Sequence, residues 1–175
     1  MELPLSAGFH TRLLRPPDLR ALQALFERAG DYFEMVTGAP PGRDEAERAF
    51  VAGPPQKSVN DKRIIGVFSD ADVLVGVLDA ITDWPEPGCW SMGGLIFDPA
   101  FRGRGLGRAV LDAFERWATG EGAERFRTAV VGHHARGRRF LESAGYRRLG
   151  GGAEDVPQTV VFFEKGRFPR GKSLS

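Results

Sequence analysis

The sequence predicts a single α/β domain built on a mixed sheet with helices on its faces. Three observations predict this class. Two β-type runs, Arg63–Phe68 and Val73–Ile81, flank the turn-forming "SDAD" and indicate a hairpin. A glycine-rich loop stands between a strand ending in "FDP" and a helix with clear apolar periodicity. After that helix the elements run strand, helix, then strands, and 175 residues suffice for one buried core.

The N-terminal third begins with a predicted strand, Phe9–Leu14. Pro16, Pro17 and Asp18 then mark the start of a predicted helix. Its apolar face consists of Leu19, Leu22, Leu25 and Phe26. We expect Gly30 to end this helix. Residues 31–60 are the least regular part of the chain, with a helix-like "RDEAERAFVA" between proline-rich stretches.

The strand after the hairpin is Cys89–Phe97, in which Gly93 and Gly94 together suggest a bulge or a close backbone approach. The next helix begins near Leu106, and its apolar face indicates that it packs on the sheet. The remaining elements are expected at Glu124–Val131 (strand), Ala135–Ala144 (helix capped by Gly145), "YRRL" and "TVVFFEK" (strands). The domain should span residues 9–165, with a flexible segment at 1–8 and a flexible basic tail at 166–175.

Composition restricts the function classes. The net charge of +1 predicts no strong attraction to nucleic acid or to a membrane, and no stretch is apolar enough to span one. A single cysteine, Cys89, excludes an internal disulfide and fits a reducing compartment, so we expect a cytoplasmic protein. His133 and His134 are adjacent and lack a third ligand at suitable spacing, so no metal is expected.

The glycine loop is predicted to bind a phosphate group. A helix N-terminus offers unpaired N–H groups and partial positive charge, glycines allow an anion to approach, and arginines add charge-assisted contacts. The nucleoside-triphosphate pattern fails because Arg108 is not followed by a Lys-Ser/Thr pair, and the dinucleotide pattern G-x-G-x-x-G also fails. A disordered Arg-Gly tract is the alternative. The residues concerned are Arg102, Gly103, Arg104, Gly105, Leu106, Gly107 and Arg108.

The pattern that does fit is R-x-x-G-x-G, formed by Arg102, Gly105 and Gly107. With "HARGRRFLESAGY" (His134–Tyr146), it resembles the GNAT-type N-acetyltransferases. The resemblance implies a mostly antiparallel sheet with a splayed strand pair, and acetyl-coenzyme A as cosubstrate. It implies that the loop holds the pyrophosphate, that His134 lies near the cofactor, and that the pantetheine arm pairs with Leu95, Ile96 and Phe97.

Two departures from the family's pattern concern catalysis. Leu141 stands where the family's tyrosine acid would be, and Gly93 stands where a strand carboxylate often serves as base. A thiolate leaves readily at neutral pH, since a thiol pKa is about 8.5, whereas an alkylamine with a pKa of about 10.4 must first lose a proton. The base is therefore the harder requirement. We assign it to Asp79, with Asp83 and Glu86 as alternatives.

An acceptor pocket is expected from aromatic and acidic residues, which suit a cation. The predicted substrate-binding residues are Tyr32, Asp83 and Trp84. An ordinary surface with one buried ring is the alternative for these segments.

The predicted reaction is transfer of an acetyl group from acetyl-coenzyme A to a primary amine of a small molecule, by direct attack without an acyl-enzyme at Cys89. The alternatives are a protein N-terminal or lysine acetyltransferase, a different acyl chain, and an acyl-coenzyme A sensor or scaffold without catalysis. The sequence does not name the amine, and it leaves a homodimer open.

Overall fold

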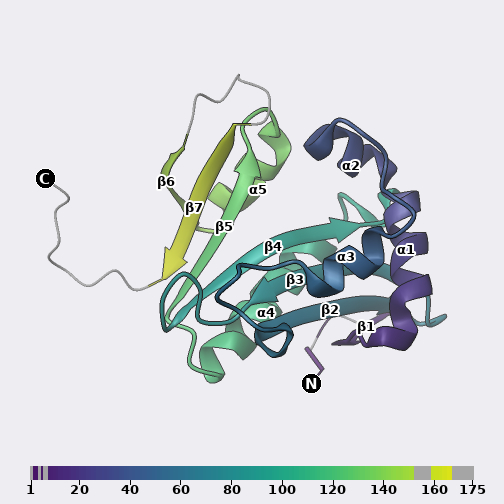
Figure 1. Cartoon of the computed structure of the whole chain (residues 1–175), viewed down its shortest axis with the longest axis horizontal. Coiled ribbons are helices and arrows are strands. Elements are labelled where there is room, and N and C mark those ends of the chain that lie inside the picture. The colour runs from purple at the N-terminus through teal and green to yellow at the C-terminus, as the bar shows by residue number, and fades with distance from the viewer. Residues whose placement is uncertain (1, 4, 6–7, 152–158, 167–175) are drawn as a thin grey trace, which may run out of the picture.

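The computed structural model describes residues 2–3, 5, 8–151 and 159–166. One seven-stranded sheet runs through the molecule in the order β1-β2-β3-β4-β5-β7-β6 (Figure 1). The strands are β1 Phe9–Leu13, β2 Lys62–Ser69, β3 Leu74–Ile81, β4 Cys89–Phe97, β5 Arg125–Val131, β6 Arg147–Gly151 and β7 Val160–Gly166. The helices are α1 Leu19–Arg28, α2 Gly30–Thr37, α3 Glu45–Val51, α4 Leu106–Gly120 and α5 Ala135–Ser143.

The sheet is mostly antiparallel, and its one parallel pair, β4 with β5, divides it into two halves. The β4–β5 ladder joins Cys89–Met92 to Arg125–Thr128 and ends there. Beyond Met92, β4 continues beside β3 while β5 continues beside β7, so the two halves diverge toward α2 and α5 (Figure 1). The predicted fold class, including the splayed strand pair, is confirmed.

Helices cover both faces of the sheet because strand side chains alternate between two apolar clusters. On one face, α1 and α3 pack over Ile64, Phe68 and Val77. On the other face, the apolar stripe of α4 packs over Ile65, Val67 and their neighbours, together with Leu141 of α5. Each cluster is continuous, so strand residues on either side of the sheet are fixed in position by burial.

The predicted elements match the observed ones closely, with one correction. Gly30 does not end a helical region, because α1 ends at Arg28 and Gly30 is the first residue of α2. Leu3, in the segment expected to be flexible, is buried, and its N–H donates to Thr11 Oγ1 at 2.6 Å. The predicted tail lies outside the described residues from position 167 onward. In the described ranges, no helix combines the length and apolar character needed to cross a membrane.

Candidate active site

The splay frees one edge of β4 along Gly93–Phe97. The Asp98 N–H donates to Val75 O on β3 at 2.9 Å, which fixes the direction of the backbone groups that precede it. Because these groups alternate in an antiparallel ladder, those of Leu95 and Phe97 face away from β3 and toward the gap. Leu95 thus offers a backbone donor and acceptor to a ligand in the gap, whereas Phe97 O already accepts from Arg102 Nε at 2.8 Å.

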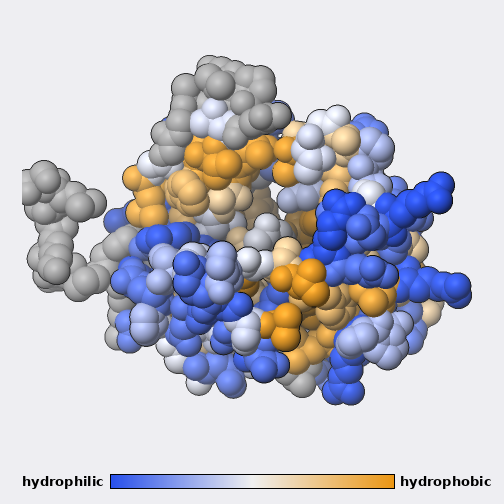
Figure 2. Space-filling model, viewed as in Figure 1, coloured by the Kyte–Doolittle hydropathy of each residue, from blue (hydrophilic) through white to orange (hydrophobic). Residues whose placement is uncertain are grey.

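A cavity of about 740 Å³ occupies the gap, a size typical of small-molecule and cofactor sites. Figure 2 shows the hollow between α2 and the β5–β7 half, with apolar side chains gathered along it. The lining residues come from the free edge of β4, the glycine loop, α2, β5 and α5. Of the predicted cofactor-binding residues, it is lined by Leu95, Ile96, Phe97, Arg102, Gly103, Gly105, Gly107, Arg108 and His134.

The glycine loop leads directly into the N-terminus of α4. Gly103 and Gly105 adopt φ values of 77° and 81°, and Gly105 is the N-cap residue without a side-chain cap. The first helical N–H groups of α4 therefore lack side-chain capping and carry the positive end of a 15-residue helix. A Cβ added at Gly105 would meet no atom within 4 Å, so the space above the loop is open to a diphosphate.

Two of the three arginines of the loop have structural partners. Arg102 forms a bidentate ion pair with Asp31 of α2, with N–O distances of 2.5 and 2.9 Å. Arg108 Nε pairs with Asp112, and its Nη1 donates to Ser143 O. Arg104 is exposed and does not line the cavity, and Leu106 is buried in the core. In this conformation the guanidinium groups of Arg102 and Arg108 are engaged in these contacts, so the backbone amides are the anion donors that the loop presents to the cavity.

His134 is the N-cap residue of α5 and lines the cavity. Burial is the largest cause that lowers the pKa of His134, and the nearby His133 and arginines lower it further. Its ring is therefore neutral at pH 7. A Cβ added at Gly137 would lie 2.2 Å from the His134 ring. The residues at these two positions are therefore coupled, because the His134 ring leaves no room for a side chain at 137.

Asp79 lies on β3 at the bulge. The register pairs Asp79 with Gly94 and then Ala80 with Met92, which leaves Gly93 as the extra residue. A Cβ added at Gly93 would be 3.1 Å from Asp79 Oδ2. A side chain at position 93 would thus begin in tight contact with the Asp79 carboxylate, which would have to move slightly to admit it.

Two opposing effects act on the Asp79 carboxyl. Its Oδ2 accepts from Lys62 Nζ at 3.0 Å, while Oδ1 is buried and accepts no hydrogen bond from any residue that the structure describes. Burial raises the pKa of Asp79, and the ammonium of Lys62 opposes that rise only in part. A carboxylate with a raised pKa is a stronger base than an ordinary one, which suits proton abstraction.

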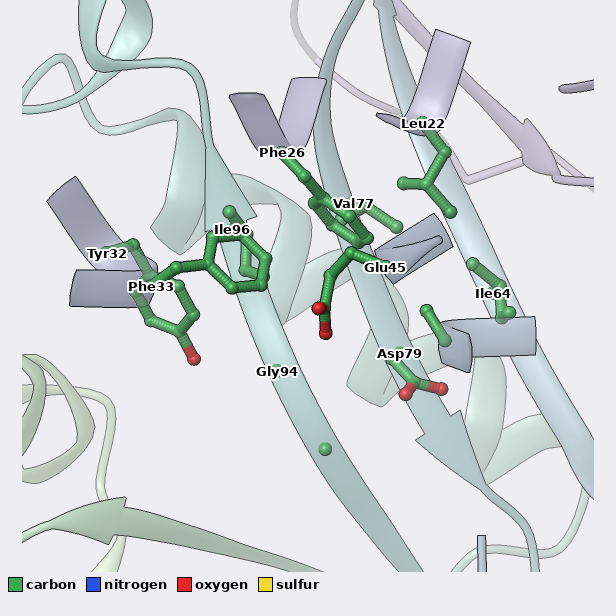
Figure 3. A pocket seen from close by; sticks show the side chains of 12 residues that line it. Leu22, Phe26, Tyr32, Phe33, Glu45, Ile64, Val77, Asp79, Gly94 and Ile96 are labelled. Carbon is green, nitrogen blue, oxygen red and sulfur yellow. The ribbon is translucent and has the colours of Figure 1, made fainter. Parts of the chain in front are cut away.

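A second, smaller cavity of about 140 Å³ lies on the other side of the bulge, under α1, α2 and α3. Its walls include Leu22, Phe26, Phe33, Ala49, Ile64 and Val77, and its polar groups come from Asp79, Glu45 and Tyr32 (Figure 3). Tyr32, Gly93, Gly94 and Ile96 line both cavities. The two spaces therefore share a wall at the bulge.

Tyr32 was predicted to bind substrate, and the structure places it in this shared wall. Its hydroxyl lies 3.8 Å from a Cβ added at Gly94. Burial raises the pKa of Tyr32, which keeps the phenol protonated and able to donate. Glu45, the first residue of α3, was not predicted, because an acidic residue in the first turn of a helix is ordinary in sequence.

The other predicted acceptor residues lie elsewhere. Asp83 and Trp84 belong to the β3–β4 loop and line neither cavity; Asp83 Oδ1 accepts the Gly88 N–H at 2.8 Å and stabilises that turn. Cys89 is buried, at the end of β4 remote from the bulge, and burial raises its pKa. Its thiol is thus unsuited to form an acyl-enzyme.

Leu141 and Tyr146 belong to the segment that resembles the family, and both are buried. Leu141 is buried and presents only an apolar side chain to the larger cavity. Tyr146 is buried, and its hydroxyl donates to Glu115 Oε1 at 2.8 Å. Within the described residues, no group of three or more His, Cys, Asp or Glu side chains could hold a metal ion.

Comparison with known proteins agrees with this geometry. The model of the acetyltransferase (GNAT) family matches residues 21–146. An acetyltransferase from Thermus thermophilus shares 24% identity at a TM-score of 0.72, over 94% of this chain and 100% of that one. An acetyltransferase from Salmonella typhimurium that modifies the N-terminal serine of ribosomal protein L7/L12 shares 14% identity at a TM-score of 0.74, over 96% and 100%.

A ribosomal L7/L12 alpha-N-protein acetyltransferase in complex with coenzyme A is also similar, with 14% identity and a TM-score of 0.75, over 95% of this chain and 98% of that one. No curated protein sequence matches the chain. The splayed sheet and the glycine loop define an acyltransferase fold. The chain belongs to the acetyltransferase (GNAT) family, and the predicted family membership is confirmed.

Proposed function

We propose that the protein transfers an acetyl group from acetyl-coenzyme A to a primary amine of a small molecule. The observation that carries the proposal is that two cavities lie on either side of a shared wall at the β4 bulge, one lined by the glycine loop and the other by Asp79. The amides of Gly105 and the first turn of α4 would hold the diphosphate. The backbone groups of Leu95 would pair with the pantetheine arm.

Asp79 acts as the general base in this proposal. An ammonium group in the smaller cavity donates a hydrogen bond to the buried Oδ1 and then transfers one proton to it. The neutral nitrogen attacks the thioester carbonyl, a C–N bond forms, and the C–S bond breaks with its electron pair passing to sulfur. An N–H group of the free β4 edge stabilises the oxyanion, which is often the largest catalytic contribution.

Tyr32 is the proposed proton donor to the departing sulfur. Leu141 cannot supply a proton, and the Tyr32 phenol lies between the two cavities with a raised pKa. The nitrogen loses its second proton to solvent, and the amide and free thiol are the products. Because a thiol pKa is about 8.5, the contribution of this donor should be smaller than that of the base.

The test is thiol release from acetyl-coenzyme A with a panel of primary amines, with the acetylated amine identified by mass. Asp79→Asn should lower kcat by about 10²- to 10⁴-fold, the range typical of a positioned general base. Asp70→Asn, in the exposed β2–β3 turn, is the matched control and should leave kcat unchanged. Tight binding of acetyl-coenzyme A without thiol release from any amine would favour a sensor and contradict the proposal.

A further inference from the structure

The smaller cavity has the size and lining of a binding site for one compact apolar group. Its volume of about 140 Å³ is close to that of the ~150 Å³ apolar cavity that holds benzene in an engineered protein. Aromatic and aliphatic side chains from α1, α2, β2 and β3 form its walls. Leu22 and Phe33, which form part of its wall, are buried in the α1–α3 core, so the wall is fixed by packing and limits how much apolar volume can enter.

Two carboxylates face this apolar space. Figure 3 shows Glu45 directed from α3 into the cavity on the side where Asp79 approaches from β3. The Glu45 carboxylate has weak partners: Gly42 N–H at 3.3 Å, and Arg48 Nη1 at 3.7 Å. Arg48 is closer to Asp44, with which it forms a hydrogen bond. Glu45 is thus free to accept a stronger donor.

The balance of charge around the cavity leaves room for one cation. The side chain of Lys62 is buried and pairs with Asp79, while Arg48 pairs more closely with Asp44, so Glu45 has only the distant guanidinium of Arg48, at 3.7 Å, as a cation. Asp79 Oδ1 adds a buried acceptor that no described residue satisfies. An unpaired buried acceptor is costly, and an ammonium group would satisfy it and neutralise Glu45 at once.

We infer that the acceptor is a small monoamine whose apolar part, of about benzene size, fills the cavity while its ammonium group lies between Glu45 and Asp79. This inference rests on the proposed function and names its substrate class. Tyr32, Gly93 and Gly94 belong to the wall that this cavity shares with the larger one. In this inference the amine nitrogen reaches the acyl group past that wall. A peptide N-terminus does not fit, because its first residue carries a polar amide chain that the apolar walls would desolvate without partners.

The experiment uses benzylamine, benzyl alcohol and a peptide with a free N-terminal serine as probes, on the full chain with coenzyme A or acetyl-coenzyme A. Binding to the coenzyme A complex is measured by calorimetry, and turnover by thiol release. Benzylamine should bind, benzyl alcohol should bind at least tenfold more weakly for want of the charge, and the peptide should not bind in the cavity.

Two variants with matched controls on the same helix test the residues. Glu45→Gln should weaken benzylamine binding about tenfold or more, since a charge-assisted hydrogen bond is lost, whereas Glu47→Gln on the exposed side should not. Ala49→Phe fills the cavity and should abolish binding, whereas Val51→Phe, at a residue that is 71% exposed, should not. Thermal stabilisation by coenzyme A verifies that each variant is folded.

The outcomes separate this inference from the proposed function. Acetylation of the serine peptide with a lower KM than benzylamine would overturn the substrate class while leaving acetyl transfer intact. Equal benzylamine affinity in E45Q and E47Q would overturn the role of Glu45. Benzylamine binding that depends on Glu45, without thiol release, would support the site and contradict the proposed reaction.

Discussion

The diphosphate site at the glycine loop can be tested by one substitution, Gly105→Val. Gly105 has a φ of 81°, and an added side chain would meet nothing within 4 Å. The cost to the free protein is therefore the backbone strain alone, about 1–2 kcal/mol. At about 2–4 °C per kcal/mol for a chain of this length, the melting temperature should fall by about 2–8 °C. The new side chain adds bulk at a residue that lines the cavity proposed to hold the diphosphate.

Gly122→Val is the matched control. Gly122 also has a positive φ, of 102°, and open space around it, but it lies beyond the C-terminal end of α4, away from the loop. Both variants should lose similar stability without ligand. They should differ only in how they respond to acetyl-coenzyme A.

The assay is the melting temperature at a ligand concentration 100 times the dissociation constant of the native protein. Native-state binding then adds about 2.7 kcal/mol, so the native protein and G122V should gain about 5–11 °C. G105V should gain less than about 1 °C if its affinity is a thousandfold weaker, because the ligand is then at one tenth of its dissociation constant. ATP and NAD serve as comparison ligands. A full ligand-induced gain in G105V would refute the assignment of the diphosphate to this loop.

Three further predictions concern the bulge. Gly93→Ala should lower kcat by displacing the Asp79 carboxylate, 3.1 Å from the new Cβ. Gly120→Ala, at the end of α4 and outside both cavities, has nothing within 4 Å of its new Cβ and should not; equal rates in the two variants would contradict the placement of the base. A general base must be ionised to act, and burial raises the pKa of Asp79. The value of kcat/KM should therefore fall as the pH drops through a pKa above the ordinary carboxyl range. This inflection should be absent from the pH profile of D79N. Tyr32→Phe should lower kcat by about tenfold or less with KM for acetyl-coenzyme A unchanged, since the thiolate can leave without a proton donor; an unchanged kcat would remove Tyr32 from the mechanism.

The sequence predicted the elements that local patterns determine. The bulge at Gly93 and Gly94, the glycine loop and the strands of the hairpin all follow from residue types within a few positions of one another. Gly30 was misjudged because glycine is common after a helix end, but here a second helix begins at that residue.

The partners of the site residues depend on contacts between distant segments, which a single sequence does not specify. Arg102 fits the phosphate-binding pattern, yet its partner, Asp31, is 71 residues away on α2. Glu45 faces the smaller cavity because α3 packs on α1, a contact that the irregular stretch at 31–60 gave no means to predict. Asp83 and Trp84 show the reverse case: their chemistry suits a cation, but the β3–β4 loop carries them away from both cavities.

Gly93 and Asp79 are best understood as one adaptation. The resemblance led us to expect a carboxylate at position 93, and glycine there at first suggests lost catalysis. However, a side chain at 93 would begin 3.1 Å from the Asp79 oxygen, a tight contact that the Asp79 carboxylate would have to relieve by moving. Glycine at 93 therefore leaves the Asp79 carboxylate in its present position, in the wall of the smaller cavity. If Asp79 is the base, as we propose, glycine at 93 supports that role, and the departure at 93 does not by itself favour a binding protein that has lost its chemistry.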